Sequence, residues 1–252
     1  NALKLAKSHI EATRPNLIIL VDYVEFNLKI ANYAKSLGIS VIFYIAPQLW
    51  AWRERRAQDL VKNVDYLAVI FPFEEIFFKK YTNNVSYVGQ PLFENKSLLN
   101  SVKKYEDRDI DLGIFPGSRE SEIKNNIYLM LDCIQKNKNE NIKIFYANQT
   151  SLKLLKKLLS PELHSMLESG QNISQVSSCK KALCASGTVT LELAILEIPM
   201  IVMYKLSFLT FLIMRSLVKL KYIGLVNLVL GDEIGSEPIV QEYIQPSYSD
   251  QI

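Results

Sequence analysis

Residues 111–123 read DLGIFPGSRESEI, and this stretch indicates the fold of the chain. The short apolar run 111–115 has the length and composition of a buried strand. A proline and a glycine then break the strand, and residues 120–137 have the periodicity of a helix. The same order of strand, glycine turn and helix returns over residues 181–197, where ASGT separates the two elements. This alternation predicts a mostly parallel sheet covered by helices on both faces.

The alternation extends along the chain in both directions. Strands are expected at 17–21, 41–45, 66–70, 85–88, 142–147 and 200–204, with helices at 26–37, 50–62, 74–81 and 151–159. The polar, charge-rich stretch 95–111 is the best candidate for a linker. We therefore predict an α/β chain of two Rossmann-like domains, residues 1–100 and 101–252, which face a cleft.

The composition excludes several classes of protein. Hydrophobic residues make up 49% of the 252 residues and charged residues 22%, which is typical of a folded globular chain. A net charge of +3 is too mild to indicate a nucleic-acid partner. No apolar run reaches the roughly 18 to 20 residues of a membrane span. Cys133, Cys179 and Cys184 have neither CxxC spacing nor a nearby histidine pair, which predicts reduced, buried thiols and no metal site.

The turn ASGT at 185–188 is the sharpest candidate for a binding site. Gly187 permits a tight turn, and Ser186 or Thr188 can cap the helix that follows. The free amides of the first helical turn then suit a phosphate or diphosphate. Glu192 lies on the same helical face as Thr188, where its carboxylate could accept hydrogen bonds from ribose hydroxyls. An ordinary capped helix with a solvated glutamate explains this spacing equally well.

A second turn of the same kind is PGSR at 116–119. Arg119 is expected at the carboxyl edge of the sheet, where open α/β sheets bind ligands. Its planar guanidinium suits an anionic diphosphate. The alternative is a surface arginine that pairs with Glu120 or Glu122.

Two acids follow the first expected strand at the corresponding edge of the N-terminal half. A carboxylate at Asp22 or Glu25 could remove a proton from an acceptor hydroxyl within hydrogen-bond reach. Acids that stabilise the start of the next helix are the alternative, and the pattern alone favours that alternative.

Two segments combine apolar and basic side chains. The sequence WAWRERR at 50–56 pairs Trp50 and Trp52 with cations that begin at Arg53, which suits a lipid-phosphate acceptor or a membrane interface. The stretch 204–222 is apolar and aromatic, carries Arg215 and three lysines, and contains no acid. Such a segment can lie on an anionic bilayer. Core packing of an indole and a buried helix with a basic rim are the alternatives.

The motifs form an ordered set along the chain. They are VDYVEFN at 21–27, YIAPQLWAWRERR at 44–56, FPFEEIFF at 71–78, YVGQPL at 87–92, FPGSRESEI at 115–123, ASGTVTLEL at 185–193, YKLSFLTF at 204–211 and LVNLVLG at 225–231. Their order and spacing resemble lipid-A-disaccharide synthase, a bacterial glycosyltransferase family with two Rossmann-like domains (GT-B). The resemblance spans residues 16 to about 246, and the combination of motifs is far more specific than any one of them.

The resemblance implies an inverting transferase with UDP-diacylglucosamine as donor and diacylglucosamine 1-phosphate as acceptor. Its products would be the β(1-6)-linked disaccharide of lipid A and UDP, with no metal or other cofactor. It also implies a cytoplasmic protein on the inner face of the bacterial inner membrane, and it is compatible with a homodimer. The alternatives are a UDP-N-acetylglucosamine epimerase of the same architecture and a non-catalytic remnant that binds UDP or membrane.

The resemblance also assigns roles to residues. Donor-site roles fall on the PGSR residues Ser118 and Arg119, the diphosphate loop Ser186, Gly187 and Thr188, the ribose-binding acid Glu192, and the later polar positions Asn227 and Gln241. Asp22 matches the first acid of the family motif IDxPDFN, as the base or as a residue that positions the acceptor.

The sequence departs from the family pattern at several places. Glu25 replaces the second acid of the IDxPDFN motif, Val24 and Val226 replace prolines, and Gln90 replaces the histidine of VGHP. The family's first strand with its GExSGD loop and its C-terminal helical tail have no counterpart here. The resemblance therefore implies an incomplete N-terminal domain, with roughly the first 80 and last 40 residues of a typical member absent.

Overall fold

The computed structural model describes residues 2–47, 49, 54–136, 140–204, 224–234 and 238–244. These residues form two compact units, one within residues 1–91 and the other beginning at Leu92. The division precedes the expected domain boundary at 100/101, and the expected linker 95–111 belongs to the second unit. Each unit contains one parallel sheet, so the predicted α/β class is confirmed.

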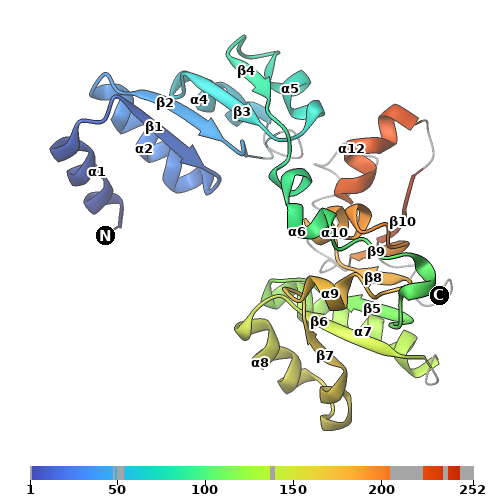
Figure 1. The fold of residues 1–252 in the computed structure, drawn as a ribbon. Coiled ribbons are helices and arrows are strands. Elements are labelled where there is room, and N and C mark those ends of the chain that lie inside the picture. The colour runs from blue at the N-terminus through green and yellow to red at the C-terminus, as the bar shows by residue number, and fades with distance from the viewer. Residues whose placement is uncertain are drawn as a thin grey trace. The chain divides into compact units, whose positions relative to one another are not determined.

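The first unit contains a sheet with the strand order β1-β2-β3-β4, parallel throughout (Figure 1). Its elements are α1 (Ala2–Thr13), β1 (Leu17–Val21), α2 (Val24–Ser36), β2 (Ser40–Tyr44), the 3₁₀ turn η1 (Glu54–Arg56), α4 (Ala57–Lys62), β3 (Tyr66–Val69), α5 (Pro72–Phe78) and β4 (Val85–Tyr87). The expected strands are all present, and α1 is an additional helix that the sequence analysis missed.

The described helices of this unit cover one face of its sheet. Strands that follow one another in sequential order through right-handed crossovers place every connecting helix on the same side. Val41 and Phe43 of β2 are accordingly fully buried in the core under the helices. On β1, in contrast, Leu17, Ile19 and Val21 are 43%, 58% and 50% exposed. The expected helical cover on both faces is therefore not found among the described residues of this unit.

The second unit contains a parallel sheet with the order β10-β9-β8-β5-β6-β7. Its elements are η2 (Pro91–Glu94), α6 (Lys96–Leu99), η3 (Tyr105–Asp107), β5 (Leu112–Phe115), α7 (Glu120–Lys136), β6 (Ile142–Tyr146), α8 (Gln149–Leu158), η4 (Pro161–Met166), β7 (Leu167–Ser169), α9 (Ile173–Val176), β8 (Ala182–Cys184), α10 (Val189–Ile195), β9 (Met200–Tyr204), α12 (Leu225–Ile234) and β10 (Gln241–Ile244). The chain runs outward from β5 to β7 and then returns to β8, so the strand order reverses between β5 and β8.

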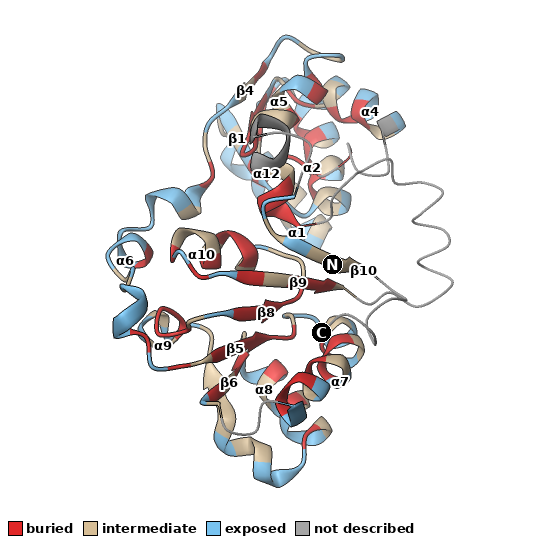
Figure 2. Ribbon diagram, turned by 90° about the vertical axis from the view of Figure 1, so that its right-hand side faces the viewer, coloured by how far each residue is buried: buried red, intermediate tan, exposed pale blue. Residues whose placement is uncertain are grey.

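This reversal distributes the helices over two faces. Helices α7 and α8 pack on one side of the sheet, where Ile123, Ile127 and Met130 of α7 are fully buried against the strands. Right-handed crossovers in the opposite direction place α9 and α10 on the other side (Figure 1). Buried residues accordingly concentrate along β5, β8 and β9 (Figure 2). Helical cover on both faces is thus confirmed for the second unit.

Arg108, only 5% exposed, joins three segments of the second unit. Its guanidinium donates to the carbonyls of Lys103 (2.8 and 3.1 Å), Cys179 (3.3 Å), Leu196 (2.9 Å) and Glu197 (3.0 Å). Two of these carbonyls lie at the C-terminal end of α10, where the helix dipole favours a cation. Arg108 therefore fixes the end of the helix that carries Glu192.

Replacing Arg108 by methionine is expected to lower the free energy of unfolding of the second unit by about 3 kcal/mol. Methionine preserves much of the volume but leaves buried carbonyl oxygens without a donor. Urea unfolding followed by circular dichroism measures the change, with the exposed Arg55→Met as the matched control. Equal unfolding midpoints for the two variants would contradict this role.

The three cysteines are buried and lie outside any disulfide. Burial raises the pKa of the Cys179 and Cys184 thiols to about 12, which keeps them protonated and unreactive at neutral pH. The prediction that the three thiols are buried is confirmed. Within the described ranges, no helix has the length and apolar character needed to cross a bilayer.

Candidate functional site

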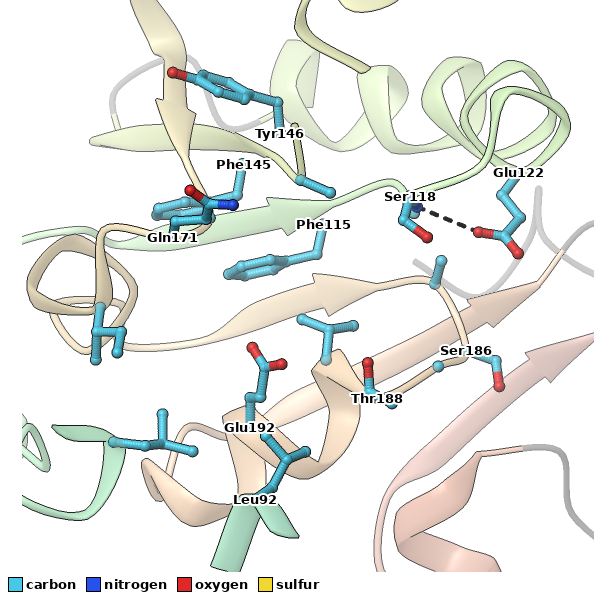
Figure 3. Close-up of a pocket in the computed structure, with 18 of the residues that line it drawn as sticks. Leu92, Phe115, Ser118, Glu122, Phe145, Tyr146, Gln171, Ser186, Thr188 and Glu192 are labelled. Carbon is cyan, nitrogen blue, oxygen red and sulfur yellow. Dashed lines mark hydrogen bonds between the residues drawn. The ribbon is translucent and has the colours of Figure 1, made fainter. Parts of the chain in front are cut away.

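A cavity of about 450 Å³ opens at the carboxyl ends of β5, β6, β7 and β8 (Figure 3). It lies where the strand order reverses between β5 and β8, which is the usual ligand position in an open α/β sheet. Its volume lies in the range of small-molecule sites. The cavity lies within the second unit, and its lining comes from the ends of these strands, from α10 and from the segment 92–98.

The structure brings the two glycine turns together. The Ala185 amide donates to the Phe115 carbonyl over 2.8 Å, so β5 and β8 end side by side. A Cβ added to Gly117 would lie 3.6 Å from the Cβ of Ala185. Ser118 and all three residues Ser186, Gly187 and Thr188 line the same cavity. A single ligand can therefore contact both turns.

The β8–α10 turn depends on Gly187 and on a residue that the sequence analysis did not single out. Gly187 has φ 155°, a conformation that strongly favours glycine. The hydroxyl of the fully buried Thr190 donates to the Gly187 carbonyl over 2.7 Å. Thr188 occupies the N-cap position, but its hydroxyl makes no capping hydrogen bond, so of the two caps that the sequence allows, the one by Thr188 is not formed. Thr190 holds the turn instead.

The β5–α7 turn is held by Glu122, whose side chain is 12% exposed. One carboxylate oxygen accepts from the backbone amide of Ser118 (3.2 Å; Figure 3) and from that of Arg119 (3.3 Å). The other oxygen accepts from the Arg119 guanidinium (2.8 Å). The Arg119 side chain is 79% exposed and is not part of the cavity wall. The pairing of Arg119 with Glu122, which the sequence analysis left open, is the arrangement in the structure.

Glu192 enters the cavity from α10. Its carboxylate points toward Phe115, whose ring stacks on Phe145 with centroids 4.6 Å apart (Figure 3). Burial in this partly apolar setting raises the pKa of Glu192 above its usual value. Among the described residues, none donates a hydrogen bond to this carboxylate. Glu192 is therefore placed as an acceptor for a ligand that enters the cavity.

Asn227 and Gln241 do not reach this cavity. The side chain of Asn227, 1% exposed, donates to Val240 O (2.8 Å) and Glu242 Oε1 (2.6 Å) and accepts from Val240 N (3.0 Å). Gln241 opens β10 and lines a second, mostly aliphatic cavity of about 500 Å³. Asn227 therefore ties α12 to β10, and the donor-site roles of both residues stay predictions.

In the first unit, the two candidate acids have different surroundings. Glu25 forms a two-contact ion pair with Arg56, at 2.5 and 3.1 Å. The exposed Asp22 has no ion pair or side-chain hydrogen bond with any residue that the structure describes. Asp22 follows β1 directly and Glu25 lies in the first turn of α2, so both are near the carboxyl edge of the sheet. Among the described residues, Glu25 is therefore paired with a cation and Asp22 is not.

The same edge carries unusual backbone conformations. Asp22 (φ 50°), Tyr23 (φ 38°) and Ile45 (φ 58°) are left-handed without being glycine, and they follow the adjacent strands β1 and β2. Such residues are uncommon, and a β-branched isoleucine is an outlier in this region. Non-glycine residues with this backbone conformation concentrate at functional sites.

Other predicted contacts lie outside the described residues. These are Trp50, Trp52, Arg53 and Arg215, the candidates for acceptor or membrane contact. The described residues contain no group of three or more His, Cys, Asp and Glu side chains that could hold a metal ion.

Several cavity residues escaped the sequence analysis. Phe145 and Tyr146 end β6, and the rule that placed Arg119 at the carboxyl edge would have placed them there too. Gln171 follows β7, a three-residue strand with the sequence LES that gives no apolar signal. Asn95 and Leu98 fall in the polar stretch 95–111, whose composition predicts a linker and not a binding site.

Comparison with known proteins gives the chain its family. The family model described as lipid-A-disaccharide synthetase matches residues 2–251. The lipid-A-disaccharide synthase of Nitrosococcus oceani is 35% identical over 96% of this chain and 65% of its own length. That of Coxiella burnetii is 34% identical over all of this chain and 69% of its own. The chain thus spans about two thirds of the length of the curated relatives that it matches.

Solved structures show the fold at lower identity. The complex of S. aureus MnaA with UDP has a TM-score of 0.58 and 12% identity over 92% of this chain and 68% of that one. The UDP-GlcNAc 2-epimerase of Neisseria meningitidis bound to UDP-GlcNAc has a TM-score of 0.57 and 15% identity, over 92% and 71%. These likenesses confirm the predicted architecture of two Rossmann-like domains. The family match over residues 2–251 and the relatives at 34–35% identity show that the chain belongs to the lipid-A-disaccharide synthase family.

Proposed function

We propose that this chain forms the greater part of an inverting glycosyltransferase that joins two acylated glucosamines. The donor would be UDP-diacylglucosamine, the acceptor diacylglucosamine 1-phosphate, and the products the β(1-6)-linked lipid A disaccharide and UDP. The observation that carries the proposal is the convergence of the PGSR and ASGT turns on one cavity at the reversal point of the second sheet. Family membership supplies the reaction.

The second unit would bind the donor. The backbone of Ser186, Gly187 and Thr188 would contact the diphosphate, with Ser118 from the neighbouring turn. Glu192 would accept hydrogen bonds from the ribose hydroxyls. The exposed Arg119 would leave Glu122 and turn its guanidinium to the diphosphate, which carries more charge than one carboxylate.

The first unit would supply the group that acts on the acceptor. Asp22 suits a base better than Glu25, because the Glu25 carboxylate is occupied by its ion pair with the Arg56 guanidinium. In the reaction, the acceptor hydroxyl oxygen forms a bond to the donor's anomeric carbon while the bond from that carbon to the diphosphate breaks. The hydroxyl proton goes to Asp22, and the bonding electron pair leaves with UDP, whose charge Arg119 stabilises.

The protein would act at the inner face of the bacterial inner membrane as a peripheral protein, because both substrates carry acyl chains. The basic and aromatic segments around Trp50, Trp52, Arg53 and Arg215 would contact the bilayer or the acceptor. The same reaction would need no cofactor, and the proposal is compatible with a homodimer.

The test uses the purified full-length protein with both lipid substrates in detergent micelles. Mass spectrometry follows the disaccharide, and a coupled assay follows UDP. We expect equal amounts of both products, and an Arg119→Ala variant is expected to turn over far more slowly. UDP binding without disaccharide would favour the remnant, and epimerisation of soluble UDP-N-acetylglucosamine would favour the epimerase.

Replacing Glu192 by glutamine is expected to weaken UDP binding about tenfold, because charged hydrogen bonds to hydroxyls are lost. Burial raises the pKa of Glu192, so wild-type affinity should fall as the pH drops through that raised pKa, while the variant loses this dependence. The folded state without ligand binds more protons at this site than the unfolded state. The ionised carboxylate therefore costs stability at neutral pH, and the variant should melt slightly higher.

Isothermal titration calorimetry with UDP between pH 5 and 8 and a melting curve measure both effects. Glu162→Gln, an exposed glutamate of η4, is the matched control. A variant that binds UDP as the wild type does would remove Glu192 from the site.

A further inference from the structure

Asn27 lies one turn into α2 and is 8% exposed. Its side-chain amide donates to the Val21 carbonyl (3.0 Å) and to the Asp22 carbonyl (2.7 Å). Its backbone amide donates to the Tyr23 carbonyl (3.1 Å). One residue therefore binds three consecutive carbonyls, those of the last residue of β1 and of the two left-handed residues that follow.

The conformation that these bonds hold is a costly one. Asp22 and Tyr23 are both left-handed, and each such residue other than glycine costs on the order of 1 kcal/mol or more. Tyr23 cannot recover this cost through core packing, because it is 70% exposed. A turn of this kind persists only when its surroundings determine it, and the bonds from Asn27 provide that determination.

The direction of the Asp22 carboxylate follows from this turn. The side chain makes no ion pair or hydrogen bond with the described residues, so its own contacts do not orient it. Its Cα–Cβ direction is set by the backbone at positions 21–23, which Asn27 fixes. On the other side of the turn, Arg56 holds Glu25 and keeps that carboxylate paired.

The second unit contains a matching arrangement. Asn126 of α7, 1% exposed, donates its side-chain amide to the Pro116 carbonyl at 3.2 Å. Pro116 begins the turn that carries Ser118 and Arg119. In each unit, a buried asparagine of the helix reaches back to the turn that precedes it. Asn126 thus offers a matched comparison for Asn27.

We propose that Asn27 is a positioning residue for turnover, which holds the β1–α2 turn so that Asp22 faces the acceptor hydroxyl. The proposal rests on the proposed function, because it takes Asp22 as the base. The two asparagines would then have different roles. Asn27 acts on turnover through Asp22, and Asn126 acts on nucleotide affinity through the β5–α7 turn.

The experiment compares Asn27→Ala, Asn126→Ala and the wild type in the full-length enzyme. For Asn27→Ala we expect kcat to fall about 10- to 100-fold, since a small misplacement of a reacting group has this effect, while the Kd for UDP changes less than about twofold. For Asn126→Ala we expect the Kd for UDP to rise about tenfold. Tyr23→Gly in the Asn27→Ala background should restore part of kcat, because glycine adopts the left-handed conformation without strain.

An unchanged kcat in Asn27→Ala, with only a lower melting temperature, would overturn the positioning role. Loss of UDP affinity in the same variant, or no recovery with Tyr23→Gly, would also overturn it. If Asn27→Ala does not fold, Asn27→Ser is measured, and its one hydroxyl should leave an intermediate kcat. A wild type that neither binds UDP nor makes disaccharide would instead overturn the proposed function, so the two failures are distinct.

Discussion

Replacing Asp22 by asparagine is expected to lower kcat by about 10²- to 10⁴-fold, the usual contribution of a general base. The substitution preserves size and one acceptor oxygen but removes the carboxylate that takes the acceptor's proton. Because Asp22 is exposed and has no ion pair among the described residues, the fold should be unaffected. Steady-state turnover with both lipid substrates measures the change, and the Kd for UDP should stay at its wild-type value.

Glu25→Gln, in the first turn of α2, is the matched control. It removes a negative charge three residues from Asp22 and breaks the ion pair with Arg56. Its effect on kcat therefore measures how much that ion pair contributes to holding the β1–α2 turn. We expect kcat to fall less than about tenfold, because an exposed ion pair contributes about 1 kcal/mol or less. A larger loss of kcat in Glu25→Gln than in Asp22→Asn would indicate that Glu25, and not Asp22, is the base.

Replacing Gly117 by alanine is expected to weaken UDP binding about 100-fold. Gly117 has φ 117°, where a side chain is strained, and a Cβ there would lie 2.8 Å from the Glu122 Cβ and 2.9 Å from its carboxylate. The added methyl would push Glu122 off the amides of Ser118 and Arg119 and move the turn. Strain and displacement together cost about 3 kcal/mol, which corresponds to a factor of about 100 in affinity.

Two other glycines provide controls for this variant. Gly38 has φ 73°, and a Cβ added there would meet no heavy atom within 4 Å. It lies in the first unit, so Gly38→Ala should lower stability without changing UDP affinity. Gly187 has φ 155° and open space, so Gly187→Ala should weaken UDP binding less than Gly117→Ala does. Equal affinity in Gly117→Ala and Gly38→Ala would show that the β5–α7 turn is not part of the nucleotide site.

The convergence of the two glycine turns could be predicted because it follows from chain order and parallel pairing. Once 111–115 and 181–185 are strands of one parallel sheet, both turns must lie at its carboxyl edge, and the structure makes the strands neighbours. The position of Glu122 could not be predicted in this way. Its carboxylate accepts from the backbone amides of Ser118 and Arg119, and this choice of partners depends on side-chain geometry that spacing does not show.

Site residues that rest on motif order alone could be predicted less well than those that follow from the sheet topology. The resemblance matches Asn227 and Gln241 to donor-site positions by their order along the chain, yet the side chain of Asn227 is bonded to Val240 and Glu242 at β10. The role of Asn27 was also hidden, because an asparagine in a helical stretch gives no sign of which carbonyls it will reach. The three-residue strand β7 was missed because its sequence carries no apolar run.

The exposed apolar face of β1 affects experiments on fragments of this protein. Three of its five aliphatic side chains face solvent on a strand that also ends the described sheet, so its hydrogen-bonding groups and its apolar surface are open together. That combination is a template on which other chains can add as strands. The N-terminal unit expressed alone should therefore form oligomers that grow with concentration, and solubilising substitutions belong at Leu17, Ile19 and Val21.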